Sequence, residues 1–200
     1  MVPLSVLLGV LALLSVIQTV GKSGHGLPAA VTGLLTGAFY GLIVRAYLRR
    51  GQARATSQIP LALVAGPVAT LLPFALPFVS VGGNTGPVLV VGDLLLLCGF
   101  AFSVWSLRCL DRNLSVVPQA RTLVQHGPYA RVRHPLYLGE LVAMLGLALS
   151  LGGPGPLLLW AALLCLQAYR AIQEERLLCA ALPDYADYTT RTSRIVPGIF

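Results

Sequence analysis

The sequence predicts an all-α protein, a polytopic bundle of about six transmembrane helices. Of its 200 residues, 56% are hydrophobic and only 10% are charged, whereas soluble domains carry about 25% charged residues. The mean hydropathy is +0.79, and the apolar residues gather in stretches close to the ~20 residues that a bilayer requires. Membrane lipids are therefore the expected surroundings of the chain.

The predicted spans are apolar stretches separated by turn residues or polar segments. They cover residues 2–20, 27–47, 60–80, 87–107, 135–152 and 156–172. The fifth and sixth are short for a transmembrane helix, so their ends are the least sharply defined.

Basic residues occur in every second predicted loop. Arginines follow the second, fourth and sixth spans, within residues 45–54, 108–133 and 170–194, while the other loops contain one cation, Lys22. The positive-inside rule then places both termini and the two long basic loops in the cytoplasm, an N-in/C-in topology. Topology and anionic lipid headgroups explain the net charge of +7, and no nucleic-acid partner is expected.

Two spans have distinctive compositions. Small residues recur at every fourth position of the second span, at Ala29, Gly33, Gly37 and Gly41. This spacing predicts a smooth helix face for close packing. The third span contains Pro60, Pro67, Pro73 and Pro77. Because interior prolines remove backbone hydrogen bonds, we expect this span to be bent or broken.

A dense polar stretch precedes the fifth span. Residues 127–139 read Gly-Pro-Tyr-Ala-Arg-Val-Arg-His-Pro-Leu-Tyr-Leu-Gly. Pro135 suits the first helical turn, which places His134 at the helix entrance, and Tyr137 and Glu140 share a face of the helix that follows. An interfacial anchor would explain the tyrosines and arginines, but it does not explain the Gly-Pro and His-Pro pairs. Glu140 either lines a site or pairs with an arginine.

A second polar cluster follows the sixth span. Arg170 and Glu174 are four residues apart on one helix face, and Glu175 is next. Alone, they would be interpreted as a local ion pair. However, the Gly/Pro turn at residues 152–156 predicts an antiparallel hairpin that brings both clusters to one membrane face. Beyond it, Leu177, Leu178, Tyr185 and Tyr188 predict a short amphipathic helix on the membrane surface, ending at Arg194 and Pro197.

Several chemistries lack their sequence signatures. The chain has no GxGxxG or P-loop opening a helix, no HExxH and no GxSxG. Its histidines, His25, His126 and His134, are not spaced as a metal site, so no metal is expected. The four cysteines have no CxxC spacing and are expected to be free thiols. The intramembrane acid Asp93 has no evident role.

Together, the two clusters resemble the integral-membrane methyltransferase family of isoprenylcysteine carboxyl methyltransferases and phospholipid N-methyltransferases. The resemblance covers about residues 112–197. It rests on Thr122-Leu-Val124, Gly127-Pro-Tyr129, Arg133-His-Pro-Leu-Tyr137 with Gly139, Glu174-Glu175, Leu178, Tyr185, Tyr188, Arg194 and Pro197. The apolar pattern divides the chain into N-terminal transmembrane helices, four spans in residues 1–107, and a region of residues 108–200 with two spans and a cytoplasmic C-terminal segment. The resemblance implies that this second region is methyltransferase-like and catalytic.

The resemblance also implies the cofactor, S-adenosyl-L-methionine, in a cytoplasm-facing pocket roofed by the loop and the C-terminal segment. The implied cofactor contacts are Gln119, Arg121, Thr122, Leu123, Val124, Tyr129, His134, Pro135, Leu136, Tyr137 and Glu174. Arg170 and Glu174 would be catalytic, Glu174 by accepting from the donor's amino group or ribose. Arg170, and Glu140 if it lines the site, would face the methyl acceptor.

The residues suit this chemistry. A sulfonium, an ammonium and a carboxylate call for aromatic faces, acidic acceptors and basic donors, and the two clusters supply all three. The expected reaction is lipid modification, a methyl transfer to a lipophilic acceptor, most readily a carboxylate of an isoprenylcysteine, another isoprenoid or a fatty acid. Phospholipid amines and small thiols stay open as acceptors.

Two other classes of protein remain alternatives. One is a membrane-embedded NADPH-dependent reductase with a related C-terminal hairpin, and the other is a non-enzymatic transporter or scaffold. The oligomeric state is not readable from the sequence. The arginine-rich, lysine-poor composition indicates a bacterial inner membrane, with the active site facing the cytoplasm.

Overall fold

The computed structural model describes Val10, Ala38 and residues 41–46, 48–49, 52–80, 82–114 and 116–198. The predicted first span and most of the second lie outside the described residues. So do Lys22, His25 and three of the four small residues on the second span, Ala29, Gly33 and Gly37.

The described residues are mainly helical and include a short antiparallel pair of strands. In chain order the elements are β1 (Ala55–Thr56), α3 (Pro60–Leu71), the 3₁₀ helix η1 (Leu72–Phe78), α4 (Gly86–Leu110), the 3₁₀ helix η2 (Asp111–Asn113), β2 (Gln119–Ala120), the 3₁₀ helix η3 (Gly127–Ala130), α5 (Pro135–Leu151), α6 (Pro154–Ala181) and α7 (Tyr185–Arg191).

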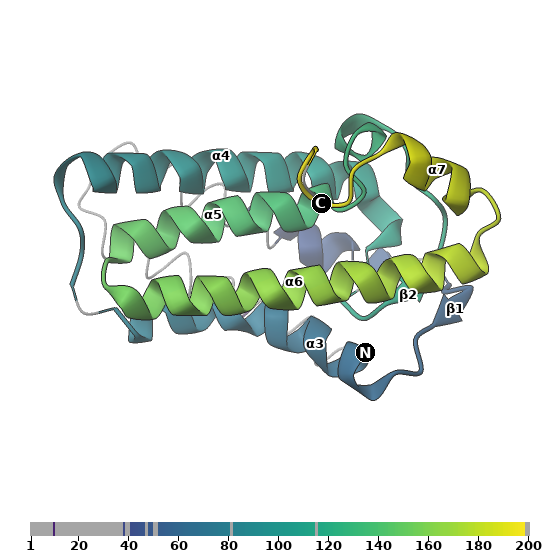
Figure 1. The fold of residues 1–200 in the computed structure, drawn as a ribbon, viewed down its shortest axis with the longest axis horizontal. Helices are drawn as coiled ribbons and strands as arrows, with labels where there is room; N and C mark the ends of the chain where they lie inside the picture. Colours follow the sequence, from purple (N-terminus) through teal and green to yellow (C-terminus); the bar gives the residue numbers. More distant parts are fainter. Residues whose placement is uncertain are drawn as a thin grey trace.

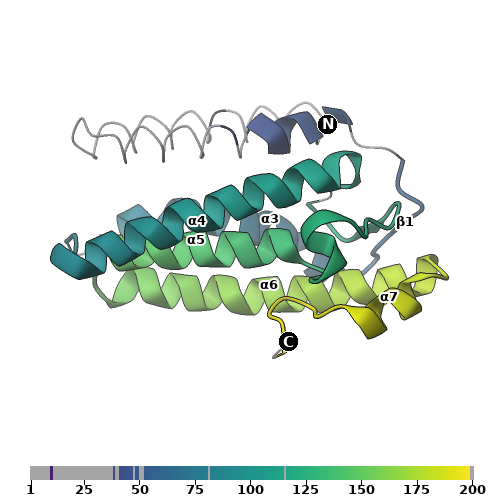
Figure 2. The ribbon, with the colours of Figure 1, turned by 90° about the horizontal axis from the view of Figure 1, so that it is seen from above.

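Helices α4, α5 and α6 run side by side, and α3 lies next to α6 (Figures 1 and 2). By length and composition, α4 and α6 could each cross a membrane, whereas α3 and α5 are shorter apolar helices. Helix α6 is longer than predicted, because it continues beyond residue 172 to Ala181. Leu177 and Leu178 therefore belong to α6, and the short helix expected to contain them is confined to α7.

The third predicted span is not one continuous α-helix, as its prolines predict. Pro67 lies inside α3, which ends at Leu71, and the chain continues as the 3₁₀ helix η1 with Pro73 in its first turn. The α-helical pattern is lost where successive prolines withhold N–H donors. The predicted third span is therefore divided between α3 and η1.

Glycines let α4 and α5 approach closely. A Cβ on Gly99 of α4 would lie 2.7 Å from both Ala143 Cα and Gly139 O of α5, distances that real Cβ atoms do not show. Such small-residue contacts bring helix backbones together where lipid supplies no hydrophobic drive. The α4–α5 pair is thereby a rigid support for the start of α5.

A tight turn reverses the chain between α5 and α6. Gly152 and Gly153 have φ angles of 70° and 80°, a left-handed conformation that glycine adopts without strain. The predicted hairpin is confirmed: α5 and α6 pack against each other in opposite directions (Figure 1). Near this turn, Ser150 donates a hydrogen bond to Asp93 at 3.0 Å, which gives the unexplained acid of α4 a structural partner.

The polar segments gather at the other end of the hairpin. There α5 begins, α6 ends, and the β1–β2 pair and α7 lie close by (Figure 1). The tail after α7 crosses back over the start of α5, where Val132 and Ser193 form a parallel bridge. The candidate site lies at this end.

Candidate active site

The two polar clusters meet directly, as the predicted hairpin requires. Tyr137 Oη, in the first turn of α5, donates a hydrogen bond to Glu174 Oε1 of α6. His134 stacks on the Tyr137 ring, with centroids 5.2 Å apart and planes inclined by 12°. Its Nδ1 lies 3.8 Å from Glu174 Oε2. An acid and two aromatic rings thus form one contiguous surface.

Glu175 is the centre of a second polar group. It accepts hydrogen bonds from Arg133 Nε at 2.7 Å and from Arg194 Nε at 2.9 Å. His134 Nε2 lies 3.3 Å from Glu175 Oε1. Because Arg133 precedes α5 and Arg194 follows α7, this carboxylate joins α6 to the loop and the tail.

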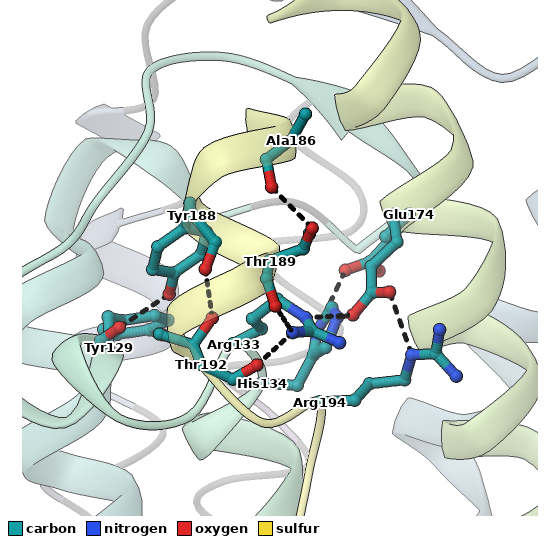
Figure 3. Close-up of polar contacts among 10 residues, drawn as sticks. Tyr129, Arg133, His134, Glu174, Ala186, Tyr188, Thr189, Thr192 and Arg194 are labelled. Atoms are coloured by element: carbon teal, nitrogen blue, oxygen red, sulfur yellow. Dashed lines mark hydrogen bonds and ion pairs between the residues drawn. The ribbon is translucent and has the colours of Figure 1, made fainter. Parts of the chain in front are cut away.

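The C-terminal segment is also fixed by backbone contacts (Figure 3). Arg133 Nη1 donates to the carbonyl oxygens of Thr189 and Thr192, and the Arg133 and His134 amides donate to Ser193 O and Arg194 O at 2.8 and 2.9 Å. The tail is therefore held against the start of α5 by both charge and backbone pairing.

Tyrosines of α7 close over the site. Tyr188 Oη donates a hydrogen bond to Tyr129 O at 2.6 Å (Figure 3), and Tyr185 packs edge-on against Tyr188. Burial raises the pKa of the Tyr188 phenol to about 12 and raises the pKa values of Tyr129 and Tyr185 as well. These phenols therefore stay protonated at neutral pH and can donate hydrogen bonds.

The loop after α4 forms the opposite wall. Asn113 Oδ1 accepts hydrogen bonds from the Thr122 amide and hydroxyl, at 3.2 and 2.6 Å. Arg121, which is buried, donates to Gln119 Oε1 at 2.7 Å. Gln119 Nε2 in turn donates to Thr56 Oγ1 at 3.3 Å. This wall is thus held in place by β1, which precedes α3 in the chain and pairs with β2.

These walls enclose a cavity. Ten of the eleven predicted cofactor contacts line it: Gln119, Arg121, Thr122, Leu123, Val124, Tyr129, His134, Leu136, Tyr137 and Glu174. Pro135 does not line it but begins α5. Leu110, Asn113, Leu114, Arg133, Leu178, Tyr185 and Tyr188 line it too.

The additional lining residues differ in how far the sequence marks them. Leu178, Tyr185, Tyr188 and Arg133 belong to the pattern that resembles the methyltransferase family, but the sequence assigns them no contact with the cofactor. Leu110, Asn113 and Leu114 were missed. The polar Asn113 directly after a long apolar span was the available signal.

The predicted acceptor residues lie behind the cavity. Arg170 does not line it, but its guanidinium carbon lies 4.7 Å from the centroid of the Tyr137 ring and its Nη2 lies 3.9 Å from Glu174 Oε1. Glu140 does not line it either and accepts a hydrogen bond from Gln167. Arg170 is joined to the cavity through Tyr137 and Glu174, and Glu140 lies one step farther away.

Comparisons with known proteins agree with this arrangement. Residues 87–182 match the family described as "Phospholipid methyltransferase". The chain is 40% identical over 81 residues to the cobalt-zinc-cadmium resistance protein CzcN of Cupriavidus metallidurans, an alignment that covers 39% of this chain and 37% of that protein. The chain thus spans little more than a third of this curated relative.

The fold also resembles a solved structure, that of the eukaryotic intramembrane Ras methyltransferase ICMT (isoprenylcysteine carboxyl methyltransferase). The TM-score is 0.57 at 16% identity, over 96% of this chain and 74% of that one. At this identity the likeness concerns the fold. With the family match, it confirms the resemblance to membrane methyltransferases, and the long apolar helices agree with an integral membrane protein.

Proposed function

We propose, on the premise that residues 87–182 are related to the membrane phospholipid methyltransferases, that this protein transfers a methyl group from S-adenosyl-L-methionine to a lipid-like acceptor. One observation carries the proposal. Glu174, Tyr137 and His134 converge from two helices on a cavity whose other wall contains Arg121 and Tyr129. A carboxylate, a guanidinium and aromatic rings are the groups that the donor's ammonium, carboxylate and sulfonium require.

The residues fit the donor group by group. Glu174 has an exposed fraction of 19% and lines the cavity, so its carboxylate is available to an ammonium or a ribose hydroxyl. The Tyr129 and Tyr137 rings offer π faces to a sulfonium. Arg121, at the opposite wall, would receive the donor's carboxylate. The 121–124 backbone and the rest of the predicted contacts would complete the pocket, with Pro135 acting by placing its neighbours.

The bound donor would supply a methyl group on a positively charged sulfur, which departs as a neutral thioether. The chain's part is to position the reactants, because in-line displacement depends mainly on alignment. The tyrosines of α7 would exclude water from the cavity. Arg170 would orient the acceptor next to Tyr137, and Glu174 would hold the donor on the other side.

The acceptor would approach from the membrane. A carboxylate, such as that of an isoprenylcysteine or a fatty acid, needs no general base because it is already nucleophilic at neutral pH. A phospholipid amine would first lose a proton. We favour the carboxylate, and we place the site at the cytoplasmic face of a bacterial inner membrane because the arginines gather at that end.

Donor binding is the first test. Isothermal titration of the purified protein in nanodiscs should show saturable binding of S-adenosylmethionine. Glu174→Gln should raise the Kd by about tenfold or more, because a hydrogen bond to a charged group contributes roughly 1.5–3 kcal/mol. Arg176→Gln, an exposed charge on the same helix, is the matched control. Absence of binding by the unaltered protein would refute the proposal.

Product analysis identifies the acceptor. Methyl-labelled donor is incubated with nanodiscs that contain phosphatidylethanolamine, N-acetyl-S-farnesylcysteine or oleic acid. A methyl ester is released by mild base, whereas an N-methyl group is not, so base treatment separates carboxylate from amine acceptors. Base-stable label in phosphatidylethanolamine would overturn our preference for a carboxylate but not the methyltransferase assignment.

A further inference from the structure

A chain of polar contacts leads from the cavity into the apolar part of the hairpin. Arg170 Nη1 donates to Gln167 Oε1 at 3.1 Å, and Gln167 Nε2 donates to Glu140 Oε2. Gln167 is fully buried and Arg170 is 5% exposed. Since Glu140 lies five positions after Pro135, it is about 7–8 Å along α5 from the helix start.

These groups are costly where they lie. A charged side chain within an apolar span costs several kcal/mol, and an apolar replacement for a buried ion pair is often neutral or stabilising. The close packing of α4 on α5 through Gly99 and Ala143 does not involve these groups. The polar chain therefore indicates a functional requirement.

The side-chain amide of Gln167 links the orientation of Arg170 to Glu140. A glutamine side chain has a donor end and an acceptor end. Glu140 Oε2 accepts a hydrogen bond from the Nε2 end of this amide, and Oε1 is then left facing Arg170. Were Glu140 neutral, the amide could turn over and present its donor end to a guanidinium that also only donates.

Arg170 has one nitrogen that takes part in none of these contacts. Its Nη1 donates to Gln167, and its Nη2 donates to Val116 O at 3.2 Å and lies near Glu174. Among the residues that the structure describes, its buried Nε has no hydrogen-bond partner. A buried donor without a partner costs about 1–3 kcal/mol. Such a donor, held over the Tyr137 ring just behind the cavity wall, suits an oxygen or other lone-pair acceptor of a ligand.

We propose that Glu140 and Gln167 are positioning residues, which lock the Arg170 guanidinium over Tyr137 with its Nε–H open to the methyl acceptor. This inference rests on the proposed function for the identity of the ligand, but the locking of Arg170 is a property of the protein alone. Glu140 and Gln167 themselves contact neither donor nor acceptor.

The test follows the Arg170 Nε–H signal in protein labelled with ¹⁵N-arginine. Arg170→Lys identifies the signal by its loss. Glu140→Gln and Gln167→Met keep side-chain volume, and each should speed exchange of the Nε proton with solvent by about tenfold or more, because local opening frees the guanidinium. Unchanged exchange in both variants would overturn the proposal.

A swapped pair provides the rescue. In Glu140→Gln/Gln167→Glu, the new amide at 140 donates to the new carboxylate at 167, which also accepts from Arg170. Exchange should return to within about twofold of the original rate. We call the Glu140–Gln167–Arg170 contacts the relay. A double variant that folds but still exchanges the Arg170 Nε proton fast would contradict it.

Matched controls separate this effect from general loosening. Asp93→Asn removes an intramembrane carboxylate paired with Ser150, and Gln173→Leu removes a buried amide outside the relay. Neither should alter the Arg170 signal; faster exchange in either control would show a global effect and refute the specific role.

Two further measurements distinguish this proposal from the proposed function. Donor Kd should be unchanged in the relay variants, because neither residue lines the cavity. With the labelled acceptor found above, Glu140→Gln should raise the acceptor KM by about tenfold while the donor KM stays constant, a split expected when only acceptor positioning is lost. Failure of donor binding in the unaltered protein would refute the methyltransferase proposal, while the exchange data would still decide the locking of Arg170.

Discussion

The Tyr137 hydroxyl donates a hydrogen bond to the Glu174 carboxylate across the α5–α6 hairpin. This contact joins two sequence segments 37 residues apart at the edge of the cavity. It both fixes the orientation of the acid and satisfies a buried phenol. The contact is therefore the most direct point at which to perturb the site.

Tyr137→Phe should weaken donor binding without unfolding the protein. The ring that stacks on His134 is retained, but Glu174 loses a donor, and the Kd for S-adenosylmethionine should rise by about three- to thirtyfold, since a hydrogen bond to a charged group contributes roughly 1.5–3 kcal/mol of which part is recovered by water. Isothermal titration measures the change. An unchanged Kd would show that this hydrogen bond does not shape the binding surface.

Glu175→Gln should release the C-terminal tail. Removing one partner of a buried charge group typically costs roughly 3–5 kcal/mol, and here Arg133 and Arg194 would both lose their carboxylate. Hydrogen exchange of residues 185–197 should accelerate more than that of α4. Asp187→Asn, an exposed acid on α7, is the control, and equal protection of the tail in both variants would contradict the anchoring role.

Gly99→Ala should destabilise the helix pair. The added methyl group would lie 2.7 Å from Ala143 Cα, so α4 and α5 must separate, and overpacking of this kind costs about 1–3 kcal/mol. Thermal unfolding in detergent should show a lower Tm. Ala101→Leu enlarges an exposed position of the same helix and should leave the Tm nearly unchanged; an equal loss there would show that size alone, not the close contact, matters.

Alkaline pH should loosen the cover over the cavity. The folded-state pKa of Tyr188 is about 12, above the value of about 10 for an unperturbed tyrosine. The associated stability is therefore fully present below pH 10 and is lost as the pH rises from about 10 to 12. Tm measured from pH 8 to pH 12 should fall less steeply in Tyr188→Phe, and identical slopes would contradict this coupling.

The sequence predicted the hairpin well because its signals are local. The Gly152–Gly153 turn, the prolines at helix starts and the apolar runs each act within a few residues, and they suffice to bring Tyr137 to Glu174. The interruption of the third span was likewise predictable from its prolines. By contrast, the length of α6 is not predicted, because an apolar pattern marks only the span up to residue 172. The helix continues through polar residues to Ala181, with Glu174 turned toward α5.

Contacts between distant segments could not be predicted in the same way. The role of Glu175 depends on residues before α5 and after α7, and none of these partners is marked by spacing along the chain. Gln167 was overlooked because an amide within an apolar helix has no distinctive pattern. Its significance emerges only when Glu140 and Arg170 are seen on either side of it.

The pairing of β1 with β2 bears on how this protein could be divided. The Arg54 and Ser57 amides donate hydrogen bonds to Ala120 O and Pro118 O at 2.8 and 3.0 Å. The strand that contains Gln119 is therefore paired with a segment that precedes α3. A fragment trimmed to residues 87–182 would leave those carbonyl groups bare and would also lack α7 and the tail. The residues that match the family are thus fewer than the residues needed to form the walls of the cavity.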